Sequence, residues 1–208
     1  IMDAKICGVK DSNTLNFIIN HKYPPKFIGF IVNYIKSKRY LNFENLNELL
    51  NTNKKNTNFV AVLVNPSNDI LEKLTKLNFD YYQLYDVTAN KTKLIKKKYN
   101  KKIISALTVK NKKDVEKFKE FKSISDIILF DSAGYEKSLG FDHALLNDVP
   151  DSITKMLAGN IQYNDKLDKY SKITDIIDIS GSLETSGEKD ISKIKIFLEN
   201  INKIKNEN

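Results

Sequence analysis

The chain has a single cysteine, Cys7, and a single arginine, Arg39, among its 208 residues. One cysteine cannot form an intramolecular disulfide, so the disulfide framework typical of small secreted domains is excluded. No apolar run approaches the roughly 20 residues that a membrane-spanning helix needs. The first ten residues also lack the basic region, apolar core and small-residue cleavage site of a signal peptide. We therefore expect a cytoplasmic protein with no membrane partner.

The net charge is strongly positive, since 34 Lys and Arg residues face 26 Asp and Glu residues, which gives +8. A basic protein can bind nucleic acid, but base and phosphate recognition relies heavily on the planar fork of arginine. Lysine supplies all but one of the positive charges here, and it accompanies many Asn and Ile residues, which share A/T-rich codons. Biased coding therefore explains the charge, and we expect no nucleic-acid partner. Arg39 is either a chance remnant on the surface or a clamp for a planar or carboxylated ligand.

Short, nearly continuous apolar runs recur at fairly even spacing, a pattern typical of strands buried on both faces of a parallel sheet. They cover residues 5–9, 27–32, 59–64, 81–85, 103–109, 126–131, 155–160 and 176–181. Stretches with helical spacing lie between and after them, at 43–50, 68–77, 111–121 and 190–204. This alternation predicts an α/β protein, a (β/α)8 TIM barrel formed by residues 1–208 as one domain. A doubly wound sheet would normally carry a G-x-G-x-x-G turn for a dinucleotide, which is missing.

Functional side chains of such a barrel lie at the carboxyl ends of the strands and in the loops that follow. The candidates at these positions are Cys7, Arg39, Gln83, Tyr85, Asp131, Gly159, Asn160, Asp178, Ser180, Gly181 and Ser182. A thiol and a carboxyl at strand ends suit a base and an acid, although a lone cysteine is also typical of inert core. The small residues at the last two strand ends suit a phosphate site or ordinary tight turns. No set of His, Cys and Asp residues has metal-ligand spacing.

Taken in order, these motifs resemble the phosphoribosylanthranilate isomerase family. The opening KICG is similar to that family's first strand, SKRY (37–40) to the loop with its substrate-contacting arginine, and ILFDS (128–132) to the strand with its catalytic aspartate. LAGN (157–160), DISGSLE (178–184) and GEKD (187–190) resemble its phosphate-binding end. The resemblance extends in order over nearly the whole chain.

The resemblance implies an Amadori rearrangement in tryptophan biosynthesis, from N-(5-phosphoribosyl)anthranilate to 1-(2-carboxyphenylamino)-1-deoxyribulose 5-phosphate, without a metal or cofactor. It implies Asp131 as general acid, Cys7 as general base and Arg39 as the contact for the anthranilate group. The remaining candidates would also bind this small phosphorylated substrate. Gln83, Tyr85 and Asp178 would contact its body, and Gly159, Asn160, Ser180, Gly181 and Ser182 its phosphate.

The sequence departs from the family pattern in three places. The fourth strand ends QLYD, so Tyr85 and Asp86 replace the usual His and Gly. The stretch 135–143 keeps only Phe141 and Asp142 clearly from a glycine-rich segment, and the phosphate turns are altered as well. Two alternatives remain open: a metal-free barrel that acts on another sugar phosphate, and a non-catalytic barrel that only binds a phosphorylated ligand. The oligomeric state is not indicated.

Overall fold

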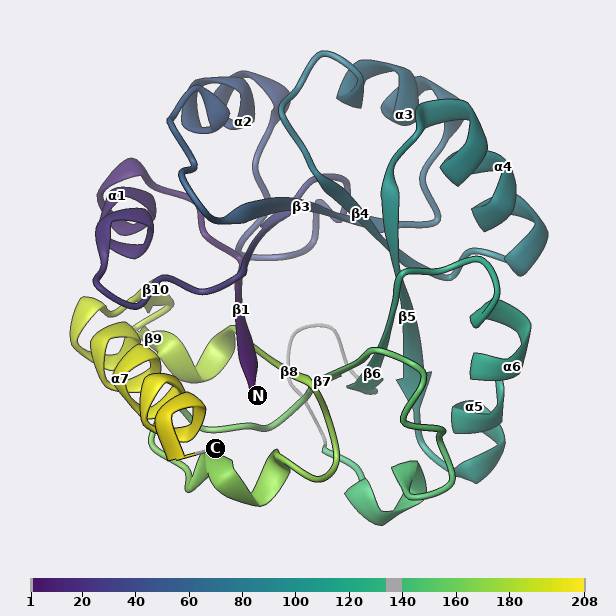
Figure 1. Ribbon diagram of the computed structural model, residues 1–208. Helices are drawn as coiled ribbons and strands as arrows, with labels where there is room; N and C mark the ends of the chain where they lie inside the picture. The colour runs from purple at the N-terminus through teal and green to yellow at the C-terminus, as the bar shows by residue number, and fades with distance from the viewer. Residues whose placement is uncertain (1, 134–139, 208) are drawn as a thin grey trace.

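The computed structural model describes residues 2–133 and 140–207. A closed barrel of eight parallel strands lies at its centre, and β8 pairs with β1 to complete it (Figure 1). The strands are β1 (Asp3–Cys7), β2 (Phe27–Ile31), β3 (Asn58–Val64), β4 (Tyr81–Tyr85), β5 (Lys102–Val109), β6 (Ile127–Ser132), β7 (Lys155–Ala158) and β8 (Ile176–Ile179). Each predicted apolar run overlaps one of them, so the (β/α)8 fold expected from the sequence is confirmed.

Helices form an outer ring around the strands (Figure 1). They are α1 (Ser12–Asn20), α2 (Phe43–Leu50), α3 (Asn68–Leu74), α4 (Ala89–Tyr99), α5 (Lys112–Glu116), α6 (Phe118–Phe121), α7 (Ile191–Glu207) and the 3-10 helices η1 (His143–Leu146), η2 (Leu167–Tyr170) and η3 (Gly181–Leu183). A two-stranded ribbon, β9 (Glu184–Thr185) with β10 (Glu188–Lys189), precedes α7. None of these helices is both long and apolar enough to cross a membrane.

The sequence predicts some of these helices better than others. The helix expected at 43–50 is confirmed as α2, whereas the one expected at 68–77 ends at Leu74. The stretch 111–121 forms two short helices that part at Lys117 instead of one. Helices α1 and α4 were not predicted.

Each helix from α1 to α5 is preceded by an N-cap residue, whose side chain accepts a hydrogen bond from the backbone N–H three residues further along the chain. These N-cap residues are Asp11, Asn42, Ser67, Thr88 and Asn111. Every cap lies in the loop that follows a strand, so the caps set where each chain segment leaves the carboxyl end of the barrel.

The apolar core has two layers, one inside the barrel and one between the strands and the helices. On β3, Val60 and Val62 belong to the inner layer, whereas Phe59, Ala61 and Leu63 pack in the outer one. Successive side chains of a strand point to opposite faces, and both faces are covered here. This is why the strands read as continuous apolar runs in the sequence.

The barrel interior is closely packed around Gly29, where there is no room for a side chain. A Cβ at this position of β2 would lie 2.8 Å from Cys7 Sγ and 3.2 Å from Lys5 Cε. We expect Gly29→Ala to lower the free energy of unfolding by about 1–3 kcal/mol, measured by urea denaturation, because the interior must shift to admit a methyl group. Gly181→Ala is the control, since its Cβ would meet nothing closer than 3.4 Å. Equal stability of the two variants would contradict this prediction.

Candidate active site

A cavity of about 410 Å³ opens at the carboxyl end of the barrel, within the range of about 300–1,000 Å³ typical of small-molecule sites. All of the candidate residues from the sequence line it: Cys7, Arg39, Gln83, Tyr85, Asp131, Gly159, Asn160, Asp178, Ser180, Gly181 and Ser182. Strand ends far apart in the sequence therefore share one space. Ile31, Val62 and Val64 from β2 and β3 add an apolar wall, with Tyr34 in the loop after β2.

An ion pair lies inside the barrel next to this cavity. Lys5 Nζ donates a hydrogen bond to Asp178 Oδ2 at 3.0 Å, and the Lys5 side chain is completely buried. The two residues are register partners on β1 and β8, the strands that close the barrel. Burial lowers the pKa of Lys5, but Asp178 and Cys7 outweigh it and raise that pKa overall. Lys5 therefore stays a cation. The other carboxyl oxygen of Asp178, Oδ1, has no hydrogen-bond partner within the described chain.

The Cys7 thiol lies two residues after Lys5 on the same face of β1, and 8% of the residue is exposed. Burial raises its pKa, and the nearby Lys5 ammonium opposes this effect without cancelling it. The group is therefore a thiol at neutral pH in the free protein. The neighbouring cation makes its ionisation less costly than burial alone would.

Asp131 ends the inward face of β6 across the cavity from Cys7. Tyr85 Oη donates a hydrogen bond of 2.7 Å to Asp131 Oδ2, and Gln83 Nε2 donates to Tyr85 Oη at 3.3 Å. Burial raises the pKa of Asp131 to about 6, although the bond from Tyr85 acts in the opposite direction. This carboxyl can therefore hold or release a proton close to neutral pH, as an acid–base catalyst must.

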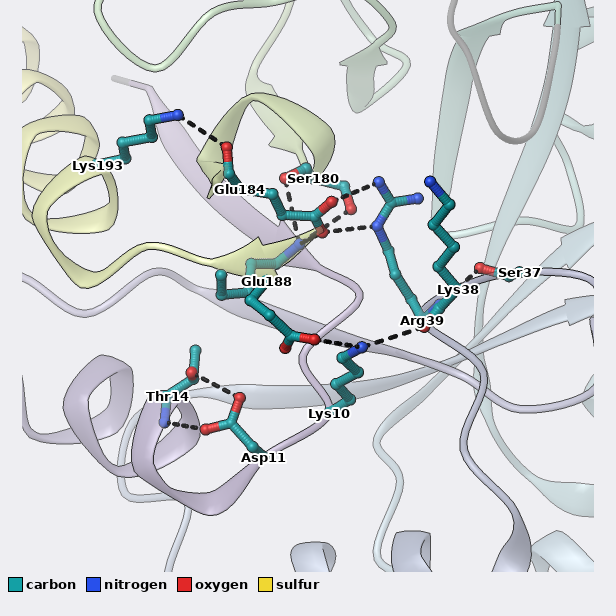
Figure 2. A network of polar contacts seen from close by, with 11 residues as sticks. Lys10, Asp11, Thr14, Ser37, Lys38, Arg39, Ser180, Glu184, Glu188 and Lys193 are labelled. Carbon is teal, nitrogen blue, oxygen red and sulfur yellow. Dashed lines mark hydrogen bonds and ion pairs between the residues drawn. The ribbon is translucent and has the colours of Figure 1, made fainter. Parts of the chain in front are cut away.

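Arg39 follows β2, and its guanidinium is held by a carboxylate from the other end of the chain (Figure 2). Its Nε and Nη2 donate to the two oxygens of Glu184 at 2.7 and 2.8 Å. Two parallel bonds of this kind fix the plane of the guanidinium, which a lysine ammonium cannot reproduce. Lys189 Nζ donates to the same carboxylate and to Ser180 Oγ, the latter at 3.2 Å. The pKa of Glu184 falls below its usual range, because these partners outweigh its burial.

Gly8 explains how the Arg39 side chain reaches this position. Its backbone has a φ of +79°, and a Cβ there would collide with the Arg39 side chain and lie 3.0 Å from Ser180 Oγ. The glycine of the KICG motif therefore leaves the space across which Arg39 extends. Any side chain at this position would displace the guanidinium and strain the backbone as well.

The turns after β7 and β8 both line the cavity, and Gly181 of the second turn lies close to Arg39. Gly159 has a φ of +105°, and a Cβ there would lie 2.8 Å from Ser132 Cβ, so the turn packs tightly on the end of β6. Asn160 follows in the left-handed region at a φ of +55°, which asparagine tolerates. After β8, Ser180 leads into η3, and the Ser182 Oγ is buried with no partner among the described residues.

Sequence reasoning missed three charged residues of this site: Lys5, Glu184 and Lys189. Lys5 gave a usable signal, because a lysine inside a buried strand needs a partner. Most of the altered glycine-rich stretch, residues 135–139 of 135–143, lies outside the described residues. Within 2–133 and 140–207, no three His, Cys, Asp or Glu side chains are grouped to hold a metal ion.

The closed parallel barrel thus brings three groups into one cavity: a thiol, a carboxyl whose pKa is about 6, and a guanidinium held in one orientation. These features define a barrel enzyme equipped for proton transfer on a small anionic substrate. Comparison with known proteins narrows this class. The chain belongs to the N-(5'-phosphoribosyl)anthranilate (PRA) isomerase family, whose sequence model matches residues 4–200. It is an isomerase of tryptophan biosynthesis.

Individual relatives match over all or nearly all of their lengths. The chain is 29% identical to N-(5'-phosphoribosyl)anthranilate isomerase of Thermoanaerobacter pseudethanolicus, covering 99% of this chain and 100% of that one. It is 30% identical to the Staphylococcus haemolyticus enzyme of the same name, over 96% and 98% of the two chains. A crystal structure of phosphoribosyl anthranilate isomerase, in complex with reduced 1-(o-carboxyphenylamino)-1-deoxyribulose 5-phosphate, has the same fold, with a TM-score of 0.84 and 23% identity over 98% and 100% of the chains.

Removing one partner of the buried ion pair should be costly. We expect Lys5→Met to lower the free energy of unfolding by about 3–5 kcal/mol, because Asp178 is then left buried without a countercharge. The double variant Lys5→Met/Asp178→Leu should recover much of this loss, since neither charge remains. Chemical denaturation measures both. Lys112→Met is the control, because its ion pair with Asp148 is on the surface and contributes little. The prediction fails if Lys5→Met is as stable as that control.

Proposed function

We propose that this isomerase converts N-(5-phosphoribosyl)anthranilate into 1-(2-carboxyphenylamino)-1-deoxyribulose 5-phosphate, with Asp131 as general acid and Cys7 as general base. The observation that carries the proposal is the shared cavity, in which both groups and the fixed guanidinium of Arg39 line a space of about 410 Å³. A known isomerase of the same fold binds the reduced product, a phosphorylated ligand with a carboxyphenyl group.

The first step opens the ribose ring. Asp131 donates its proton to the ring oxygen as the bond from that oxygen to C1′ breaks, and the lone pair of the anthranilate nitrogen forms the C1′=N bond. The substrate becomes an iminium cation with a free hydroxyl. A carboxyl whose pKa lies at about 6 is acidic enough to give up this proton and basic enough to regain it.

The second step removes the proton from C2′. Cys7 takes it in the thiolate form, after its own proton has gone to solvent. The electrons of the C–H bond form a C1′=C2′ double bond, while those of the iminium return to nitrogen. The resulting enolamine tautomerises to the ketone. Each proton transfer of this kind contributes about 10²–10⁴-fold to the rate.

Substrate binding divides the cavity into regions that match the parts of the molecule. Arg39 lines the same cavity as the apolar side chains of Ile31 and Val62, a combination that suits a ring carrying a carboxylate. The turns at Gly159–Asn160 and Ser180–Ser182 suit the phosphate. Asp178 and Gln83 line the same cavity, and their polar side chains suit the ribose hydroxyls.

The acid and the base test the mechanism most directly. We expect Cys7→Ser and Asp131→Asn each to lower kcat for phosphoribosylanthranilate by about 10²–10⁴-fold, because each removes one proton transfer. A fluorescence assay of substrate consumption and growth of a tryptophan auxotroph that lacks this isomerase measure the effect. Asp148→Asn, an exposed carboxylate outside the cavity, should retain normal turnover. Normal turnover of both active-site variants would refute the mechanism, and wild-type activity on another sugar phosphate alone would refute the substrate.

The role of Arg39 predicts a change in binding. Arg39→Lys keeps the positive charge but loses the two parallel bonds to Glu184, so the cation is no longer held in one plane. We expect KM to rise about 10–100-fold, the range that loss of one charge-assisted hydrogen bond to the substrate gives. Steady-state kinetics measure it. Lys38→Met removes the neighbouring exposed cation, which does not line the cavity, and should leave KM unchanged. An unchanged KM in Arg39→Lys would exclude Arg39 as a substrate clamp.

A further inference from the structure

Tyr85 contacts the proposed acid itself. Its hydroxyl lies 2.7 Å from Asp131 Oδ2, which is a short hydrogen bond between a buried phenol and a buried carboxyl. Burial, followed by the charge of Asp131, raises the pKa of Tyr85 well above its usual value. The phenol therefore keeps its proton at every working pH and remains a donor to the carboxyl.

Gln83 determines the direction in which this hydroxyl points. Gln83 lies two residues before Tyr85 on the same face of β4, and its Nε2 donates to Tyr85 Oη at 3.3 Å. An amide N–H cannot accept a hydrogen bond, so it occupies a lone pair of the phenol oxygen. The hydroxyl proton is then directed to Asp131. The result is a chain of two hydrogen bonds with a fixed donor direction: Gln83 donates to Tyr85, and Tyr85 donates to Oδ2 of Asp131.

The barrel provides room for this chain across one strand. Tyr85 of β4 pairs with Ala106 of β5, and Asp131 of β6 pairs with Thr108 of β5. The inward residue of β5 at this level is Ala106, which packs in the same interior cluster as Tyr85. Because the Ala106 side chain ends at Cβ, the Tyr85 phenol can extend past β5 to the Asp131 carboxyl on β6.

We propose that Tyr85 is a positioning residue for the general acid: its phenol holds Oδ2 of Asp131, so that the proton to be transferred is carried on Oδ1. This inference rests on the acid role of Asp131 in the proposed function. A bound phenol fixes the carboxyl plane, and a donor on Oδ2 excludes the transferable proton from that oxygen. Tyr85 thus acts through Asp131, rather than by binding the substrate directly.

Other charges also act on Asp131, and the test must allow for them. Asp178 on β8 raises the pKa of Asp131 and Lys5 on β1 lowers it, whereas Tyr85 on β4 supplies the only side-chain hydrogen bond among the named causes. Cys7 on β1 faces the same cavity and is a neutral thiol in the free protein. None of these groups is altered by a change of Tyr85 to Phe, so a shift in the titration reports the lost hydroxyl.

The test is the titration of Asp131 in the protein without substrate, followed by ¹³C NMR of its side-chain carboxyl and assigned with Asp131→Asn. The hydroxyl of Tyr85 stabilises the carboxylate, so its removal must raise the pKa. We expect a midpoint near 6 in the wild type and about one unit higher in Tyr85→Phe. Gln83→Met, which leaves the phenol in place but removes its orienting donor, should shift the midpoint in the same direction by less.

Tyr82→Phe is the matched control. It removes a buried hydroxyl from the same strand, and Tyr82 Oη has no hydrogen-bond partner within the described chain. The titration midpoint of Asp131 and the turnover in Tyr82→Phe should equal those of the wild type. An unshifted midpoint in Tyr85→Phe, or an equal shift in Tyr82→Phe, would overturn the inference.

Kinetics separate a positioning role from a substrate contact. The reactive state needs a proton on Asp131 and none on Cys7. Asp131 is nevertheless the stronger acid in the free protein, so this state is a small fraction of the molecules. That fraction grows with pH until Asp131 ionises and is then constant, so kcat/KM rises up to the pKa of Asp131. The midpoint of this rise should move up by about one unit in Tyr85→Phe, with KM changed less than about twofold. The substrate phosphate also titrates near pH 6, so the comparison is between variants. A raised KM with an unshifted profile would make Tyr85 a substrate contact and overturn the inference.

Failure of the inference and failure of the proposed function give different results. If Asp131→Asn turned over substrate normally, the acid role would be wrong, and the inference would fall with it whatever the titration showed. If Asp131→Asn were inactive while Tyr85→Phe titrated and reacted as the wild type does, only the inference would fail.

Discussion

Lys5 of β1 and Asp178 of β8 are paired in register on the two strands that close the barrel, and their ion pair is buried inside it. Removing these charges from water costs several kcal/mol per ion, which the 3.0 Å contact offsets only while both partners are present. The same pair forms one side of the cavity, through Asp178, and lies beside the Cys7 thiol. Barrel closure and the electrostatics of the site therefore depend on the same two side chains.

The pair acts on the proposed acid and base in opposite ways that partly cancel. Lys5 lowers the pKa values of Cys7 and Asp131, whereas Asp178 raises both, so burial remains the largest influence on each. The thiol is consequently protonated in most molecules of the free protein, and the proposed reaction uses the small fraction in which Cys7 has lost its proton to solvent. In that mechanism, ring opening stabilises the thiolate, because the iminium that it produces in the same cavity is a cation. The proposed order of steps, acid before base, thus creates a positive charge that favours the ionised form of the base.

The sequence contained enough to predict the barrel and the rim of the cavity, because both depend on local patterns. Strands buried on two faces give continuous apolar runs, and parallel strands bring their carboxyl ends to one face, so residues at those ends meet. Helix α4 was missed because its sequence, ANKTKLIKKKY, buries only Thr92 and Ile95. The pairings of Lys5 with Asp178 and of Arg39 with Glu184 were missed for a different reason. The members of the two pairs lie 173 and 145 residues apart in sequence, and only the closed barrel brings them together.

Arg39 shows how composition and structure explain one another. Lysine serves in most of the ion pairs here, such as Lys54 with Asp80 and Lys96 with Asp126, where a single ammonium meets a carboxylate near the surface. Such contacts need only a positive charge, so biased coding can supply lysine without loss. The pair between Arg39 and Glu184 needs two parallel donors in one plane, because the guanidinium must keep its orientation at the edge of the cavity. A chain that uses lysine everywhere else therefore retains its one arginine at the position where lysine cannot give the same geometry.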